Sequence, residues 1–231
     1  MSGVFIAGTD TGCGKTAVSR ALAGAARARG FTVRALKPIE TGCAGARDTR
    51  VPADALAIAR AAGDARPVHE LCPYRLELAA APAVAAAHEG VAIDVAKLRD
   101  AYRRASEGAD LVVVEAAGGL LVPAAPGLDM LALAGELELP LVLVARARLG
   151  TINHVLLSLR EALRRGARLL GVAVSHTEPA LSAADRANLD WLLAHLPAPF
   201  LGELAHTAQD DGKPSAEGLA LASLWQALEL A

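Results

Sequence analysis

The stretch Gly8-Thr9-Asp10-Thr11-Gly12-Cys13-Gly14-Lys15-Thr16 decides the fold of this chain. It follows Val4–Ala7, an apolar run typical of a short strand, and it opens Ala17–Arg29, whose apolar residues have helical spacing. Glycines in such a turn let backbone N–H groups converge on phosphate oxygens, and the start of the helix adds the positive end of its dipole. The stretch therefore predicts a phosphate-binding loop, or P-loop.

The predicted loop is longer than the usual pattern, because five residues separate Gly8 from Gly14. We expect Lys15 to reach the β- and γ-phosphates of a nucleotide and the Thr16 hydroxyl to bind Mg²⁺. Cys13 lies inside the loop, where its backbone N–H is needed rather than its thiol, so we interpret it as a spacer. A chance Gly-Lys-Thr in a glycine-rich turn is the alternative, and the flanking strand and helix argue against it.

Strand-length apolar runs alternate with longer helical stretches outward from this loop. The further predicted strands are Thr32–Leu36, Leu111–Val114, Leu141–Ala145, Leu169–Val174 and Phe200–Leu204. The further predicted helices are Ala55–Ala62, Leu78–Glu89 starting at Pro82, Val95–Ser106, Asn153–Arg165, Ala183–His195 and Ala216–Leu230. This alternation predicts a single α/β domain over residues 1–231 with a P-loop NTPase-like fold, a mostly parallel sheet with helices on both faces. Thr41–Val51, rich in Gly and Arg, is a candidate mobile loop.

Composition excludes several classes of protein. With 53% hydrophobic and 21% charged residues, the 231-residue chain can bury a core, yet no apolar run reaches the roughly 18 residues of a membrane span. A net charge of −2 and 3% aromatic residues argue against a nucleic-acid binder. Three cysteines without paired spacing and no signal peptide lead us to expect a cytoplasmic protein.

Polar residues at predicted strand ends mark a candidate site, because ligands of such sheets bind beyond the carboxyl ends of the strands. Glu115 directly follows a strand, where a magnesium-linked acid would stand, and the turn Ala116–Gly119 would let a ligand approach the backbone. Lys37 ends another strand and would stabilise a transferring phosphoryl group. Glu115 as a plain loop cap and Lys37 as a solvated strand end are the alternatives.

Two helix starts complete the candidate residues. Asp54 precedes Ala55–Ala62 and, taken alone, is best interpreted as a helix N-cap. Leu149–His154 precedes another helix, and its free N–H groups would hold a carboxylate, although Asn153 would equally serve as an N-cap. His154 has no partner in the sequence, which favours packing over catalysis. No cluster has zinc-ligand spacing, and no Gly-x-Ser-x-Gly turn occurs.

Taken together, these motifs resemble those of the dethiobiotin synthetases, the ATP-dependent carboxylases of biotin synthesis, over essentially the whole chain. The matching segments are Gly8–Thr16, Lys37–Gly42, Ala81-Pro82, Glu115–Pro123, Leu149–His154 and Phe200–Leu204. The resemblance implies a cytoplasmic homodimer that uses Mg²⁺ and converts 7,8-diaminopelargonate, CO₂ (supplied as bicarbonate) and ATP into dethiobiotin, ADP and phosphate. It implies a carbamate and then a carbamic–phosphoric anhydride as intermediates.

The resemblance also assigns roles to residues. Lys15, Lys37 and Thr11 would act on the reacting groups, whereas Thr16, Asp54 and Glu115 would hold magnesium. The diamine would contact Thr41 and Pro82, and its carboxylate would lie on the amides of Gly150, Thr151 and Asn153, across the dimer interface. The residues assigned to the nucleotide are Gly12, Cys13, Gly14, Lys15, Thr16, Ala17, Asp54, Glu115, Ala116, Ala117, Gly118, Ser175, His176, Leu204, Ala205 and His206.

Three positions depart from the family pattern. Gly12 stands where an acid is common, and Ala81 where a serine is frequent, so each removes a polar contact. Ser175-His176 replaces an asparagine-containing motif that would read adenine, and a serine cannot pair with the base through two hydrogen bonds as an amide does. We therefore hypothesise relaxed selectivity among nucleoside triphosphates.

Two other P-loop classes are alternatives. An amidoligase of the cobyrinate type usually carries a glutaminase domain with a nucleophilic cysteine, and neither Cys43 nor Cys72 lies in a nucleophile-type turn. A partition-type ATPase switch usually carries an extra lysine early in the loop, where this chain has Thr9–Gly12. Such a switch also tends to need a basic surface or a terminal membrane helix, and Ala216–Leu230 contains no Lys or Arg.

Overall fold

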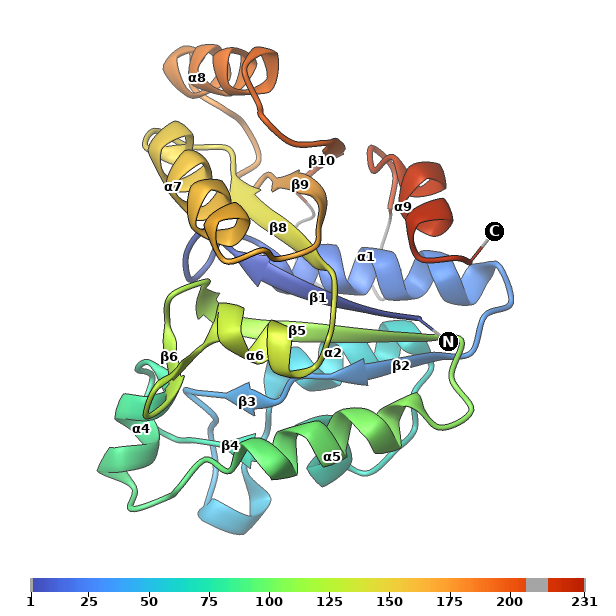
Figure 1. Cartoon of the computed structure of the whole chain (residues 1–231), viewed down its shortest axis with the longest axis vertical. Helices are drawn as coiled ribbons and strands as arrows, with labels where there is room; N and C mark the ends of the chain where they lie inside the picture. Colours follow the sequence, from blue (N-terminus) through green and yellow to red (C-terminus); the bar gives the residue numbers. More distant parts are fainter. Residues whose placement is uncertain (1, 207–215, 231) are drawn as a thin grey trace.

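A parallel sheet forms the centre of the molecule, which is described by a computed structural model over residues 2–206 and 216–230. Its six strands lie in the order β10-β9-β8-β1-β5-β2, and all neighbouring pairs run parallel (Figure 1). These strands are β1 (Ser2–Gly8), β2 (Val33–Leu36), β5 (Leu111–Gly119), β8 (Leu141–Arg146), β9 (Leu169–Ser175) and β10 (Phe200–Leu204). Every strand expected from an apolar run is present, so the predicted sheet is confirmed.

Helices cover both faces of this sheet, as predicted (Figure 1). One layer holds α1 (Lys15–Ala28), α2 (Ala53–Ala62) and α9 (Leu221–Ala227), and the other holds α4 (Pro82–His88), α5 (Val95–Ser106), α6 (Met130–Glu136) and α7 (Thr151–Arg164). Alternate side chains of β1 divide between the two cores: Val4 and Ile6 pack toward α1 and α2, and Phe5 and Ala7 toward α5 and α7. Helix α8 (Ala183–Ala194) also packs on the sheet, through Leu189 and Leu192.

Short elements between β2 and β5 were not expected from the sequence. They include the parallel pair β3 (Ile39–Glu40) and β4 (Tyr74–Arg75), the 3-10 turn Arg47–Thr49 and the helix α3 (Val68–Leu71). A second pair, β6 (Pro123–Ala125) and β7 (Leu128–Asp129), lies after β5 and is antiparallel. Elements of two to four residues are too short for hydrophobic periodicity to reveal.

Some predicted boundaries are wrong. Ala116–Gly119, expected as a turn, continues strand β5, because Gly119 pairs with Gly8 at the end of β1. The last helix is shorter than Ala216–Leu230, because Gly202 and Leu219 form an isolated bridge that holds the segment before α9 against β10. By contrast, α5 has the predicted bounds and α4 begins at Pro82. No helix in the described ranges is long and apolar enough to cross a membrane.

The packing of α5 on the sheet gives a stability prediction. Leu98 is fully buried in the core beneath α5, so Leu98→Ala removes apolar contacts and leaves a cavity. We expect the free energy of unfolding in urea to fall by about 2–5 kcal/mol. Arg104→Ala on the exposed side of the same helix is the control and should change it by less than about 0.5 kcal/mol. Equal losses in the two variants would contradict this packing.

Candidate active site

A cavity of about 680 Å³ lies at the carboxyl ends of the strands, where the sequence predicted the site. Five strands contribute to it. The P-loop follows β1, Lys37 follows β2, Glu115 belongs to β5, Ser175 ends β9, and Ala205 follows β10. Because β5 pairs with both β1 and β2, Glu115 lies between the P-loop and Lys37.

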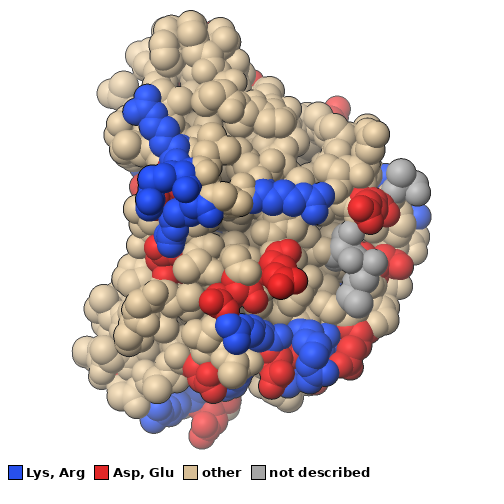
Figure 2. All heavy atoms as spheres, viewed as in Figure 1, with Lys and Arg blue, Asp and Glu red and all other residues tan. Residues whose placement is uncertain are grey.

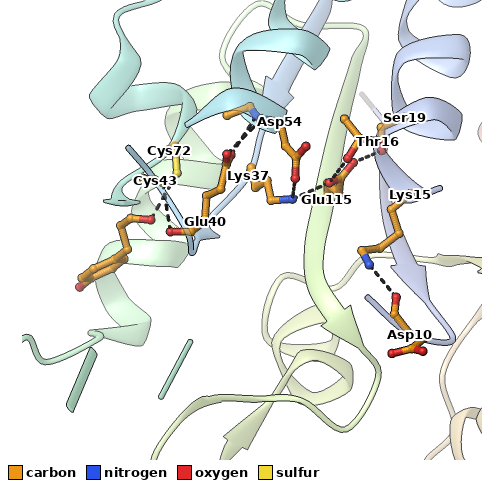
Figure 3. A network of polar contacts seen from close by, with 12 residues as sticks. Asp10, Lys15, Thr16, Ser19, Lys37, Glu40, Cys43, Asp54, Cys72 and Glu115 are labelled. Carbon is orange, nitrogen blue, oxygen red and sulfur yellow. Dashed lines mark hydrogen bonds and ion pairs between the residues drawn. The ribbon is translucent and has the colours of Figure 1, made fainter. Parts of the chain in front are cut away.

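The backbone of the P-loop is held by close packing. Gly14 caps α1 with a φ of 92°, and a Cβ atom there would overlap the Ser175 side chain, so only glycine fits. Lys15 Nζ donates to the carbonyl oxygen of Asp10 at 2.9 Å, which folds the side chain back over the loop (Figure 3). The fully buried thiol of Cys13 donates to the carbonyl oxygen of Val144 at 3.3 Å. This position supports the interpretation of Cys13 as a spacer.

Lys37 lies between two carboxylates (Figure 3). Its Nζ is 2.6 Å from Asp54 Oδ2 and 2.6 Å from Glu115 Oε1, and its side chain is only 5% exposed. Burial alone would lower the pKa of Lys37, but the charges of Glu115 and Asp54 outweigh it and raise that pKa above its usual value. The ammonium is therefore charged at neutral pH, and the interpretation of Lys37 as a solvated strand end is wrong.

Glu115 is also held by hydroxyl groups on α1. Thr16 Oγ1 donates to Glu115 Oε1 at 3.0 Å, and Ser19 Oγ donates to Glu115 Oε2 at 2.7 Å. Figure 3 shows Lys37 Nζ between the carboxylates of Asp54 and Glu115, with the Thr16 hydroxyl on the other side of Glu115, so these oxygen-bearing groups belong to one network beside the P-loop. Because these donors are all oxygen atoms, they fit Mg²⁺. Glu115 is fully buried and bound on both oxygens, so the interpretation as a plain loop cap is wrong.

Glu40, rather than Asp54, caps helix α2. Both oxygens of Glu40 accept backbone N–H groups, from Asp54 and from Ala55, each at 3.0 Å (Figure 3). Asp54 is the second residue of α2, and its side chain points to Lys37 instead of back to the backbone. Burial would raise the pKa of Asp54, but the charge of Lys37 outweighs it and lowers that pKa. Burial raises the pKa of Glu40 itself.

The opposite end of the cavity is lined by residues that follow β9 and β10. Ser175 is 2% exposed, and its side chain packs against Gly14. His176 Nε2 lies 2.7 Å from Glu203 Oε2, which fixes the orientation of the imidazole ring. Thr177, Ala205 and His206 complete this end of the cavity.

Most of the predicted site residues line the same cavity. They are Thr11, Gly12, Gly14, Lys15, Thr16, Ala17, Lys37, Thr41, Asp54, Pro82, Glu115, Ala117, Gly118, Ser175, His176, Ala205 and His206. Cys13, Ala116 and Leu204 do not line it, because their side chains are buried beneath it, and a contact through their backbone stays a prediction.

The helix start at Leu149–His154 lies apart from this cavity. Gly150, Thr151 and Asn153 are not among its lining residues. Gly150 is the N-cap of α7, with a φ of 94°, so Asn153 is inside the helix and its interpretation as the N-cap is wrong. The expected contact of these residues with a substrate across a dimer interface stays a prediction.

Several residues that line the cavity were not predicted from the sequence. Glu40 stands in the motif Lys37–Gly42, and its position two residues after a proline-terminated strand was the available signal. Ala79 and Ala80 were missed as well; together with Ala81, which was noted as a departure from the family pattern, they form an alanine wall beside Pro82. Val122 and Thr177 had no distinguishing pattern. Small apolar side chains carry no chemical signature, so only the fold could assign them.

Two solved structures of ATPases have folds similar to that of this chain. The cell division ATPase MinD of Pyrococcus furiosus aligns over 100% of both chains with a TM-score of 0.56 and 15% identity. A ParA family ATPase of Chlorobium tepidum aligns over 100% of this chain and 94% of its own, with a TM-score of 0.56 and 13% identity. At such low identity, these similarities establish the P-loop NTPase-like fold alone.

Closer relatives are found by sequence. A family model described as an AAA domain matches residues 2–211. The ATP-dependent dethiobiotin synthetase BioD of Aromatoleum aromaticum is 39% identical over 217 residues, which cover 94% of this chain and 96% of the relative. The BioD of Anaeromyxobacter dehalogenans is 40% identical over 195 residues, which cover 82% and 86%. With such identity over most of each chain, and with the P-loop and buried Lys37 in place, this chain belongs to the ATP-dependent dethiobiotin synthetase family.

Proposed function

We propose that this chain converts 7,8-diaminopelargonate, CO₂ and ATP into dethiobiotin, ADP and phosphate, with Mg²⁺ as cofactor. Family membership makes it a cyclo-ligase that uses ATP. The observation that carries the proposal is the charged Lys37 between Asp54 and Glu115, in one cavity with the P-loop and with Thr41 and Pro82. Such a cavity holds a phosphoryl donor and an acceptor side by side.

The proposed reaction has three steps. One amine of the diamine adds to CO₂ and loses a proton, which gives a carbamate. A carbamate oxygen attacks the γ-phosphorus of ATP, and ADP leaves, which gives a carbamic–phosphoric anhydride. The second amine attacks the carbonyl carbon and loses a proton, phosphate leaves, and the ureido ring closes.

The charged groups of the site suit these steps. Phosphoryl transfer depends on positioning and on neutralising charge, and Lys15 and Lys37 supply two buried cations for it. Thr11 lines the same cavity near Gly118 and would contact the reacting end of the diamine. Bound by Thr16, Asp54 and Glu115, Mg²⁺ would neutralise charge on the phosphate oxygens.

An exposed apolar surface supports the proposed homodimer. Leu149, before α7, is 73% exposed, Leu157, on α7, is 56% exposed, and Leu121, after β5, is 58% exposed. A second cavity of about 390 Å³ runs between the segment Gly119–Pro123 and the α7 residues Leu157, Ser158 and Glu161. Burying this surface against a second copy would bring the α7 start of one chain toward the cavity of the other.

The two alternative classes find less support. Burial raises the pKa of the Cys43 thiol to about 11 and raises that of Cys72, so neither cysteine is a reactive thiolate of the kind an amidoligase needs. Figure 2 shows one group of Lys and Arg side chains over α7, whereas in the lower half of that face Lys and Arg lie beside Asp and Glu; with a net charge of −2, the chain offers less basic surface than a DNA-dependent switch would use. We also propose that the enzyme works in the cytoplasm.

The first test is the dependence of ATP turnover on its partners. Phosphate release by the purified protein should require 7,8-diaminopelargonate, bicarbonate and Mg²⁺ together, because the carbamate must form before it attacks ATP. Omitting any one should reduce the rate to background, and dethiobiotin should appear in equal amount to phosphate. Stimulation by DNA or by lipid vesicles without the diamine would instead support a partition-type switch.

The second test separates the two lysines. Lys37→Ala should lower kcat about a hundredfold or more and change nucleotide affinity little, since this cation acts on the transferring group. Lys15→Ala should abolish turnover, since phosphate positioning is lost as well. Lys97→Ala, on the exposed side of α5, is the matched control and should leave kcat unchanged. A near-normal kcat for Lys37→Ala would remove that residue from the mechanism.

The third test concerns the nucleobase. Ser175 packs against Gly14 and His176 is bound to Glu203, so neither supplies an amide that could read adenine through two hydrogen bonds. We therefore expect ATP, CTP and GTP to give kcat/KM values within roughly tenfold of one another, because no paired donor and acceptor discriminates among them. A preference for ATP of several hundredfold would contradict relaxed selectivity.

A further inference from the structure

A buried ion-pair cluster lies outside the site residues described above. Arg50 Nη1 donates to Glu89 Oε2 at 2.5 Å and to the carbonyl oxygen of Arg75 at 3.0 Å, and Nη2 donates to Glu77 Oε2 at 2.9 Å. The side chains of Arg50 and Glu89 are 6% and 11% exposed, whereas that of Glu77 is 72% exposed. We call Arg50 and Glu89 the Arg50 clasp.

On one side, the clasp holds the alanine wall of the cavity. Glu89 Oε1 accepts the backbone N–H of Glu77 at 2.7 Å and lies 3.5 Å from that of Leu78, and the next residues are the lining residues Ala79–Pro82. Glu89 is also the C-cap of α4, which begins at Pro82. The Glu89 carboxylate therefore ties the residues directly before the wall to the far end of the helix that follows the wall.

On the other side, the clasp holds the segment that starts at Thr41. Arg50 lies at the end of this segment. The segment folds back on itself through a hydrogen bond from the backbone N–H of Val51 to the carbonyl oxygen of Ala44, at 2.9 Å. The N–H of Cys43 in this segment donates to the carbonyl oxygen of Leu76, the residue directly after β4, at 2.9 Å. Thr41 and the alanine wall lie about 40 residues apart in sequence. The ion pair between Arg50 and Glu89 nevertheless links the two segments that contain them.

The burial of the clasp points to a positioning role. A buried ion pair adds little net stability over an apolar pair of equal size, because both charges lose their hydration. Within the described part of the chain, the Nε of Arg50 is buried and no protein group accepts a hydrogen bond from it. What the pair does fix is geometry, because it links two segments that line one cavity.

We propose that Arg50 and Glu89 are positioning residues for the diamine subsite, holding Thr41 and the wall Ala79–Pro82 at the distance from Lys37 that the diamine spans. This inference rests on the proposed function. The nucleotide end of the cavity, lined by the P-loop and Ser175, makes no contact with the clasp through the bonds described. Loosening the clasp should therefore affect the diamine and leave ATP binding intact.

The test uses conservative variants that keep size and polarity. Arg50→Lys and Glu89→Gln should each raise the KM for the diamine about tenfold or more, since misplacement by an ångström weakens a positioned contact, while the KM for ATP stays within about twofold. Arg103→Lys and Glu107→Gln, an exposed ion pair on α5, are the matched controls and should change neither KM. The double variant Arg50→Lys/Glu89→Gln should raise the KM for the diamine no more than the single variant with the larger effect, because the two residues act as one pair.

A second readout does not depend on catalysis. Amide hydrogen exchange at residues 77–81 should accelerate in Glu89→Gln relative to the unchanged protein, while exchange in the P-loop should not. Equal rises of both KM values, or unchanged exchange at residues 77–81, would overturn the positioning role. If the unchanged protein releases no phosphate with the diamine, the proposed function fails, and the exchange experiment still decides whether the clasp holds the wall.

Discussion

The buried ammonium of Lys37 is the interaction on which the site depends. Its two carboxylate partners come from α2 and β5, so one charge joins the ends of three segments that are distant in sequence. Removing Lys37 would leave the fully buried carboxylate of Glu115 without its cation, which proteins tolerate poorly. The parallel sheet brings these groups together, because the carboxyl ends of β1, β2 and β5 lie at one edge of it.

The two halves of the cavity are built by different physical means. Around the P-loop, position is set by the backbone, through a left-handed glycine at Gly14 and a lysine held on the Asp10 carbonyl. Around Thr41 and the alanine wall, no long element is present, and side chains replace it: Glu40 anchors the start of α2, and Arg50 joins two connecting segments. A phosphate-binding half positioned by its backbone is thereby combined with a half positioned by side chains.

The sheet and most of the site could be predicted from the sequence, for reasons that particular residues illustrate. Continuous apolar runs such as Leu141–Ala145 are long enough to signal buried strands, and the loop before Lys15 has a mechanism that fixes its context. Glu40 and the pair β3–β4 were missed, because a cap supplied from a distant segment leaves no local pattern. Asp54 was ambiguous for the same reason, since an acid at a helix start serves equally as a cap or as a partner to a distant lysine.

The contact between Gly14 and Ser175 has an evolutionary consequence. Because the last residue of β9 lies directly beneath the phosphate loop, a larger side chain at position 175 would push that loop out of place. A lineage that changes its preferred base therefore has little freedom at this position. Variation should accumulate instead at His176, Ala205 and His206, which border the same end of the cavity without supporting the P-loop glycine.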